Sequence, residues 1–206
     1  MTMNDPHLET AIDAARVFLE IVAPHIEWDD EHFARTPERF ATMLMELTDA
    51  PEEDLDFTTF AAESADEMIV IRDISFHALC SHHVVPFFGV AHIAYIPGTK
   101  IAGLSKFARA VRWWSRGLWV QEKLTNEIAD YLVEQLSDKL PNGKHDEEIE
   151  IPPVGVGVIM EAEHLCMSIR GVHAPGVKTV TSAMRGAFLD KSNPAARDEF
   201  LRLIDK

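Results

Sequence analysis

Cysteine and histidine occur together in two short runs, and both runs hold the residue types that bind zinc. Cys80 and His83 are the ends of the run CSHH, and Cys166 ends the run EHLC. Two soft or borderline ligands three residues apart, with a distant third, suit a zinc ion that keeps one position open for water. Such an ion supplies hydroxide near neutral pH. The spacing alone also fits a buried cysteine beside structural histidines, so both interpretations stay open.

Two further histidines lie beside these candidate ligands. His82 adjoins His83, and His164 is two residues before Cys166. We expect residues 165–169 to continue a strand, in which residues two apart face the same side. A ligand and a proton carrier would then share a pocket, although either histidine could equally be a packed structural group.

Residues suited to a nucleotide occur at two predicted helix starts. Ser105, Lys106 and Arg109 follow Gly103, and the amides and positive dipole end of a helix there suit phosphate oxygens. A capping serine with solvated bases would look the same. Glu122 can accept two hydrogen bonds from the N–H and amino edge of guanine, as could any surface glutamate that begins a helix.

The charge distribution separates these regions from the rest of the chain. The 206 residues include 19 Lys and Arg against 34 Asp and Glu, a net charge of -15, which argues against nonspecific nucleic-acid binding. Residues 74–121 and 164–189 nevertheless contain no Asp or Glu. These two electropositive stretches predict an anionic ligand.

The sequence also indicates the cellular compartment of the protein. We find no apolar run of the roughly 18 residues that a membrane span needs, and the N-terminus lacks the pattern of a signal peptide. We therefore expect a cytoplasmic protein that binds no membrane. In that compartment, metal binding or burial is favoured over a disulfide for the two cysteines.

Hydrophobic periodicity predicts an α+β fold with antiparallel strand pairing. With 47% hydrophobic residues, the chain can form a sizeable core. Residues 49–66 are acidic and predict a linker or irregular loop. The expected helices are 7–23, 36–48, 104–114, 120–140 and 193–204, and the expected strands are 68–79, 90–96, 154–160, 165–169 and 178–182.

The runs DEMIVIRDI, CSHHVVPFFGVAHIAYIP, GLSKFARAV, VQEKLTNEIAD, EAEHLCMSIRGV and KTVTSAM, in this order, resemble GTP cyclohydrolase I. The resemblance covers residues 66–204 closely and the TPER run loosely. It implies a T-fold, an antiparallel sheet with helices packed on one side, preceded by N-terminal helices. Residues 1–65 would form the helical region and acidic linker, and residues 66–206 the catalytic domain. The subunits would close through a barrel of strands into a homodecamer of stacked pentamers, with active sites between subunits.

The resemblance also implies an activity, the hydrolysis of GTP to 7,8-dihydroneopterin triphosphate and formate. GTP would be the small-molecule substrate and Zn²⁺ the cofactor. The implied metal ligands are Cys80, His83 and Cys166, the proton carriers His82 and His164, the guanine-binding pair Gln121 and Glu122, and the triphosphate-binding residues Ser105, Lys106, Arg109 and Arg170.

Three positions or segments depart from the family pattern. Ser81 replaces the usual glutamate of CEHH, and Gly117 and Trp119 alter the run before Gln121. The segment 49–66 lacks the base that relatives often carry there. Two other functions also remain open. One is a noncatalytic assembly protein with a closed structural zinc site, and the other is a T-fold relative that acts on another pterin or deazapurine intermediate.

Overall fold

The structure is a computed structural model of the chain, and it describes residues 6–49, 55–63, 67–141 and 148–205. The chain divides into two compact units, Met1–Asp49 and Ala50–Lys206. In the first unit, helices α1 (Pro6–Val22) and α2 (Thr36–Thr48) pack together, as their apolar spacing predicts. No helix in the described part of the chain is long and apolar enough to cross a membrane.

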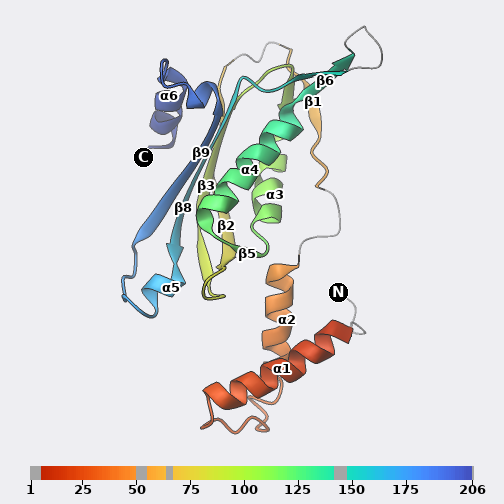
Figure 1. Cartoon of the computed structure of the whole chain (residues 1–206), viewed down its shortest axis with the longest axis vertical. Coiled ribbons are helices and arrows are strands. Elements are labelled where there is room, and N and C mark those ends of the chain that lie inside the picture. The colour runs from red at the N-terminus through yellow and green to blue at the C-terminus, as the bar shows by residue number, and fades with distance from the viewer. Residues whose placement is uncertain (1–5, 50–54, 64–66, 142–147, 206) are drawn as a thin grey trace. The chain divides into compact units, whose positions relative to one another are not determined.

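The second unit is built on a five-stranded sheet with the order β5-β2-β3-β8-β9 (Figure 1). Neighbouring strands are antiparallel except for β5, which pairs in parallel with the end of β2. Gly89 is required in this sheet, because a Cβ there would lie 1.9 Å from the Glu161 carbonyl oxygen on β8. The strands are β2 (Ile69–Cys80), β3 (Pro86–Ile96), β5 (Leu118–Trp119), β8 (Gly155–His164) and β9 (Lys178–Gly186).

Helices cover both faces of this sheet. Helices α3 (Leu104–Trp114) and α4 (Gln121–Leu136) pack on one face, where Phe107, Leu124 and Leu132 belong to the main core. Helix α6 (Ala195–Ile204) lies on the other face with the 3₁₀ turn η1 (Ala187–Leu189) (Figure 1). The α+β prediction is confirmed, but the helices do not all lie on one side, because Phe200 packs in a second, smaller core.

Two short strand pairs complete the unit. Strand β1 (Thr59–Ala61) pairs with β4 (Lys100–Ala102), and β6 (Asp138–Pro141) pairs with β7 (Glu148–Ile151). Part of the expected acidic linker is therefore a strand of the second unit. The predicted helix 120–140 was too long, because its last residues form β6.

The largest local error in the prediction concerns residues 165–169. These form the single-turn helix α5 (Leu165–Ser168), and β8 ends at His164. The alternation that would place His164 and Cys166 on the same face of a strand is therefore absent.

Candidate functional site

The three predicted metal ligands meet at the common end of β2, β3 and β8. Cys80 is the last residue of β2. Its N–H donates to the Val85 carbonyl oxygen at 2.9 Å, and this hydrogen bond closes the turn between β2 and β3. Strand β3 then pairs with both neighbours, so that Phe87 lies opposite His164, the last residue of β8. Cys166 follows in α5. Sheet register thus brings together ligands that are far apart in sequence.

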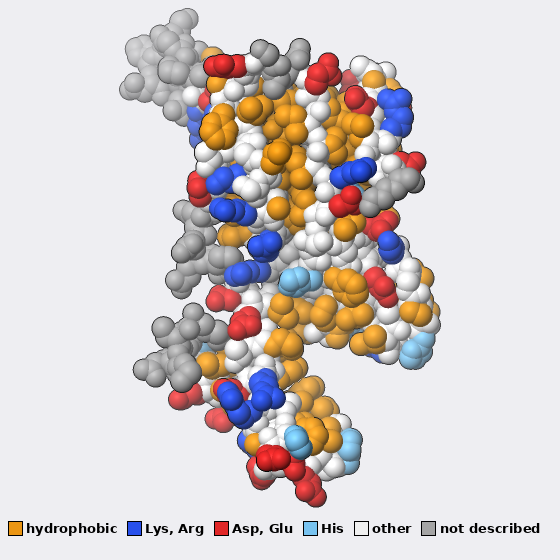
Figure 2. Space-filling view, turned by 180° about the vertical axis from the view of Figure 1, so that it is seen from behind, with side chains coloured by type: hydrophobic (Ala, Val, Ile, Leu, Met, Phe, Trp, Pro, Cys, Tyr) orange, Lys and Arg blue, Asp and Glu red, His pale blue; other side chains and the backbone are white. Residues whose placement is uncertain are grey.

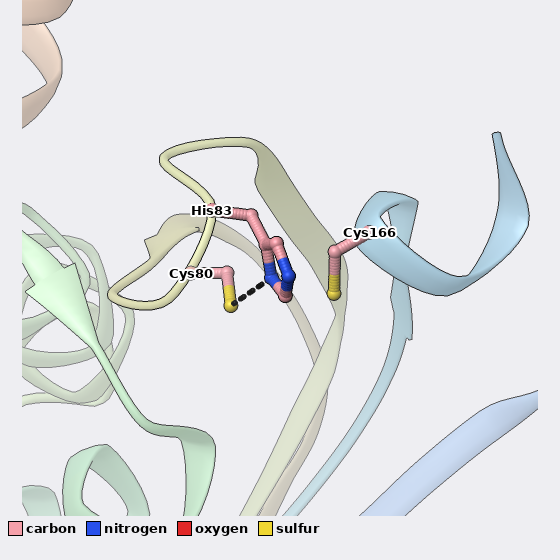
Figure 3. A group of neighbouring side chains, drawn as sticks. All are labelled: Cys80, His83 and Cys166. Atoms are coloured by element: carbon pink, nitrogen blue, oxygen red, sulfur yellow. Dashed lines mark hydrogen bonds between the residues drawn. The ribbon is translucent and has the colours of Figure 1, made fainter. Parts of the chain in front are cut away.

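The ligand atoms of Cys80, His83 and Cys166 all lie within 4.8 Å of one another, and we call these residues the metal group (Figure 3). The Cys80 Sγ is 4.0 Å from the His83 Nδ1. Cys80 is buried whereas His83 is exposed, so the group opens to the surface on one side. Two sulfurs and one imidazole match a three-ligand zinc site with one open position. In the described part of the chain no fourth donor joins this group.

The electrostatics of the two cysteines also fit a cation. Burial raises the pKa of the Cys166 thiol, and the nearby Cys80 raises it further. Arg170 opposes these effects on the same pKa, which places its guanidinium charge near Cys166. A zinc ion between the two sulfurs would favour both thiolates, because a coordinating thiol is deprotonated.

Of the two predicted proton carriers, His82 contacts the metal group, and His164, two residues before Cys166, contacts Phe87. The His82 Nδ1 is 3.7 Å from the Cys80 Sγ, and its ring contacts the ring of His83 edge-on. His164 is half-buried, and its ring stacks on Phe87 with centroids 4.6 Å apart. Burial lowers the pKa of His164, whereas the carboxylate of Glu122 acts in the opposite direction. His164 is the last residue of β8 and Cys166 lies in the first turn of α5, so the shared strand face predicted for them is absent.

The two residues of the predicted guanine-binding pair, Gln121 and Glu122, differ in exposure. The carboxylate belongs to Glu122. It lies exposed in the first turn of α4, close enough to His164 to act on its pKa. Gln121 is 2% exposed, and its side chain is hydrogen-bonded at both the oxygen and the nitrogen within the chain. The expectation that the Gln121 side chain holds guanine is therefore corrected, because its polar atoms are already engaged.

Three predicted phosphate ligands, Ser105, Lys106 and Arg109, lie on the first turns of α3, and we call them the α3 cluster. Ser105 and Arg109 are exposed. Lys106 is buried, and its Nζ donates to Asp56 Oδ2 at 2.9 Å. The Lys106 ammonium group lowers the pKa of Asp56, to which Arg109 also contributes. The sequence did not indicate this acidic partner.

The α3 cluster and the metal group lie toward opposite ends of α3. The helix begins directly after β4, whereas the chain beyond its end forms β5, where Trp119 pairs with Cys80. Eleven helical residues rise about 16 Å. The structure therefore brings His82 to the metal group and Glu122 to His164, but it does not bring the α3 cluster to them.

Arg170, by contrast, lies in the loop that follows α5. The carboxylate of Glu163 fixes this loop, because its Oε1 accepts from the Ser168 Oγ at 2.6 Å and from the Gly176 N–H at 3.1 Å. These bonds lower the pKa of Glu163. Glu163 was not predicted as a site residue, and its only sequence signal was its place in the EHLC run.

Two of the residues that depart from the family pattern, Gly117 and Trp119, lie just before α4, and the third, Ser81, follows β2. Gly117 has φ +113, which favours glycine, and the Trp119 Nε1 donates to the Arg116 carbonyl oxygen at 2.9 Å. The Ser81 N–H in turn donates to the Trp119 carbonyl oxygen at 3.0 Å. Gly117, Trp119 and Ser81 thus join the metal-binding turn to the start of α4.

Comparison with known proteins agrees with this geometry. The chain matches the sequence model of the family described as GTP cyclohydrolase I over residues 12–141 and 146–205. It is 46% identical over 192 residues to GTP cyclohydrolase 1 of Aquifex aeolicus, with 93% of each chain covered. It is 45% identical over 197 residues to GTP cyclohydrolase 1 of Hydrogenobaculum sp., with 95% of this chain and 97% of that one covered.

A third relative and one solved structure complete the comparison. GTP cyclohydrolase 1 of Listeria monocytogenes is 44% identical over 195 residues, with 93% of each chain covered. The crystal structure of the archaeosine synthase QueF-Like in the apo form covers 58% of this chain and 94% of its own, with 12% identity. Its TM-score of 0.41 is too low to bear on function.

Proposed function

Because this chain belongs to the GTP cyclohydrolase I family, we propose that its metal group holds the zinc ion used for GTP hydrolysis. The chain is a hydrolase that acts on a cyclic amidine C–N bond and converts GTP and water to 7,8-dihydroneopterin triphosphate and formate. It has the T-fold of this family. The observation that supports the zinc proposal is the convergence of Cys80, His83 and Cys166 within 4.8 Å.

The bound zinc would supply hydroxide near neutral pH for attack on the electron-poor carbon of the imidazole ring. The chain's own residues would do the rest. His82 lies beside Cys80, and His164 precedes Cys166 by two residues; both would move protons to and from the opening ring. Glu122 would accept the N–H and amino hydrogens of guanine, which fixes the orientation of the ring toward these groups.

The triphosphate would be held by the exposed bases on both electropositive stretches. Arg170 lies near Cys166, and Arg109 projects from the α3 cluster. Guanidinium groups make strong hydrogen bonds to phosphate oxygens. Lys106 would join them only when phosphate displaces Asp56, its partner in the structure.

We further propose that the α3 cluster serves the metal group of a neighbouring copy in a homodecamer, the assembly that the family implies. Within one chain, the α3 cluster and the metal group lie about the length of helix α3 apart. The outer edge of β9 has no partner strand in the described part of the chain, and strand edges favour pairing. Hydrophobic side chains also gather on the sheet face away from α4 (Figure 2), where Phe88 and Val180 are 44% and 61% exposed. A cytoplasmic location is part of the same proposal.

Formate release from GTP tests the activity, and mixed oligomers test the shared site. At a GTP concentration that saturates wild type but lies well below the KM of Arg109→Ala, Cys166→Ser and Arg109→Ala subunits should each be nearly inactive alone. If each site takes its metal group from one copy and its α3 cluster from another, refolding the two variants together restores formate release. A mixture no more active than the separate variants, with mixed oligomers present by native mass spectrometry, contradicts the shared site.

A further inference from the structure

We propose that Gln121 is a positioning residue that fixes both the ring orientation of His164 and the ring nitrogen that carries its proton. This inference rests on the proposed role of His164 as a proton carrier. It replaces the role in guanine binding that the sequence suggested for the Gln121 side chain. Four observations, each on a different contact, support it.

The orientation of the Gln121 amide is determined by its surroundings. Its Nε2 lies 3.1 Å from the carbonyl oxygens of Met160 and Thr179, and 3.1 Å from the Thr181 Oγ1. Backbone carbonyl oxygens only accept hydrogen bonds, so the amide nitrogen must face them. Exchanging the amide oxygen and nitrogen would place an acceptor against two acceptors in a buried site. The Gln121 Oε1 therefore faces His164.

This orientation decides the tautomer of His164. The His164 Nε2 lies 2.7 Å from the Gln121 Oε1, and an amide oxygen can only accept. The Nε2 must then carry a hydrogen. In the neutral imidazole the other ring nitrogen, Nδ1, keeps the lone pair and is the atom able to take up a proton.

A pair of threonines holds Gln121 itself in place. The Thr125 Oγ1 donates to the Gln121 backbone oxygen at 2.7 Å, which uses its one hydrogen. The Thr181 Oγ1, 2.6 Å away, must therefore donate to Thr125 and can accept from the Gln121 Nε2. Gln121 and Thr125 are buried, so these bonds join α4 to β8 and β9 away from solvent.

Phe87 supplies the restraint that Gln121 does not. Its ring lies parallel to that of His164, with an interplanar angle of 1° and centroids 4.6 Å apart. Stacking fixes the plane of the imidazole but permits rotation within that plane. The hydrogen bond from Nε2 to Gln121 stops this rotation. Together they hold the ring before substrate arrives, which is the condition for efficient proton transfer.

The test compares wild type with Gln121→Met, which keeps the length of the side chain but cannot accept from His164. We expect kcat to fall about 10- to 100-fold, the range for residues that orient a reacting group, with KM for GTP and zinc content unchanged. Gln135→Met is the matched control, because it makes the same substitution near the other end of the same helix, α4. Its kcat should stay within about threefold of wild type.

A spectroscopic measurement separates positioning from packing and needs no turnover. Solid-state ¹⁵N NMR of histidine-labelled protein, with the His164 signals identified by their loss in His164→Gln, should show the Nε2–H tautomer in wild type and a mixture in Gln121→Met. A wild-type Nδ1–H tautomer overturns the proposal even if Gln121→Met fails to fold. So does a folded, zinc-loaded Gln121→Met with wild-type kcat, or one with only a raised KM. Loss of GTP hydrolysis as the function would instead appear as no formate release by wild type.

Discussion

The metal group and the α3 cluster differ in how complete they are within one chain. The metal group is assembled by strand register, His82 lies beside it, and Glu122 lies close enough to His164 to act on its pKa. The α3 cluster stands a helix length away, and its buried lysine is paired with Asp56. If the proposed roles are right, the residues for bond breaking are organised by the fold of one chain, whereas the proposed phosphate ligands of the α3 cluster would need substrate and a second copy to complete their site.

The largest expected effect comes from removing a ligand of the metal group. Cys166→Ser replaces a thiolate with a hydroxyl that binds zinc poorly, so we expect loss of nearly all bound zinc and all measurable formate release. Zinc per chain by elemental analysis and formate release should be measured on the same preparation. Cys166→Ser protein with full zinc and normal turnover would remove Cys166 from the metal group.

The next largest effect should separate proton transfer from metal binding. His82→Ala and His164→Ala should retain zinc yet lose about a hundredfold or more in turnover, as for a general acid or base. His32→Ala is the control, because His32 is an exposed histidine of the first unit. A histidine whose alanine variant loses zinc or folds poorly, with normal activity in the folded fraction, is a packing residue instead.

Substitution of a proposed phosphate ligand and substitution of a proposed guanine ligand should have different effects on substrate binding. Arg109→Ala should weaken GTP binding about 10- to 100-fold, the range for a lost hydrogen bond to a charged group, and leave guanosine binding unaffected. Glu122→Gln should reduce the preference for GTP over ITP, because ITP lacks the amino group that the carboxylate accepts from. Arg109→Ala that binds GTP as tightly as wild type would contradict the phosphate assignment.

The smallest expected effect concerns Asp56, the residue paired with Lys106. Asp56→Asn removes a negative charge that competes with phosphate, so GTP should bind about two- to fivefold more tightly, in line with the modest energy of exposed ion pairs. Glu63→Gln makes the same charge change in the same segment and should have no effect. Weaker GTP binding by Asp56→Asn would mean that Asp56 positions Lys106 for phosphate.

The sequence predicted the chemistry of the site better than its geometry. Residue types and spacing indicated the metal group, because Cys80 and His83 share a turn whatever the rest of the chain does. The strand predicted at Leu165 failed because its apolar residues suit a helical turn equally well once the Glu163 carboxylate binds Ser168 and Gly176. Local pattern cannot report such a contact.

Long-range pairings were also beyond the sequence. Gln121 and His164 are 43 residues apart, and Lys106 and Asp56 are 50 apart. Neither pair has a periodic signal, because each depends on how α3, α4 and β8 pack. The hydrogen bond between Gln121 and His164 and the pairing of Lys106 with Asp56 therefore became visible only in the folded chain.

Formate release from GTP as a function of zinc content tests the central claim most directly. Wild-type protein stripped of metal by a chelator should release no formate, and activity should return in proportion to added zinc up to about one ion per chain. Cys166→Ser treated in the same way should not recover. Metal-free wild type that releases formate from GTP at the normal rate would contradict the account.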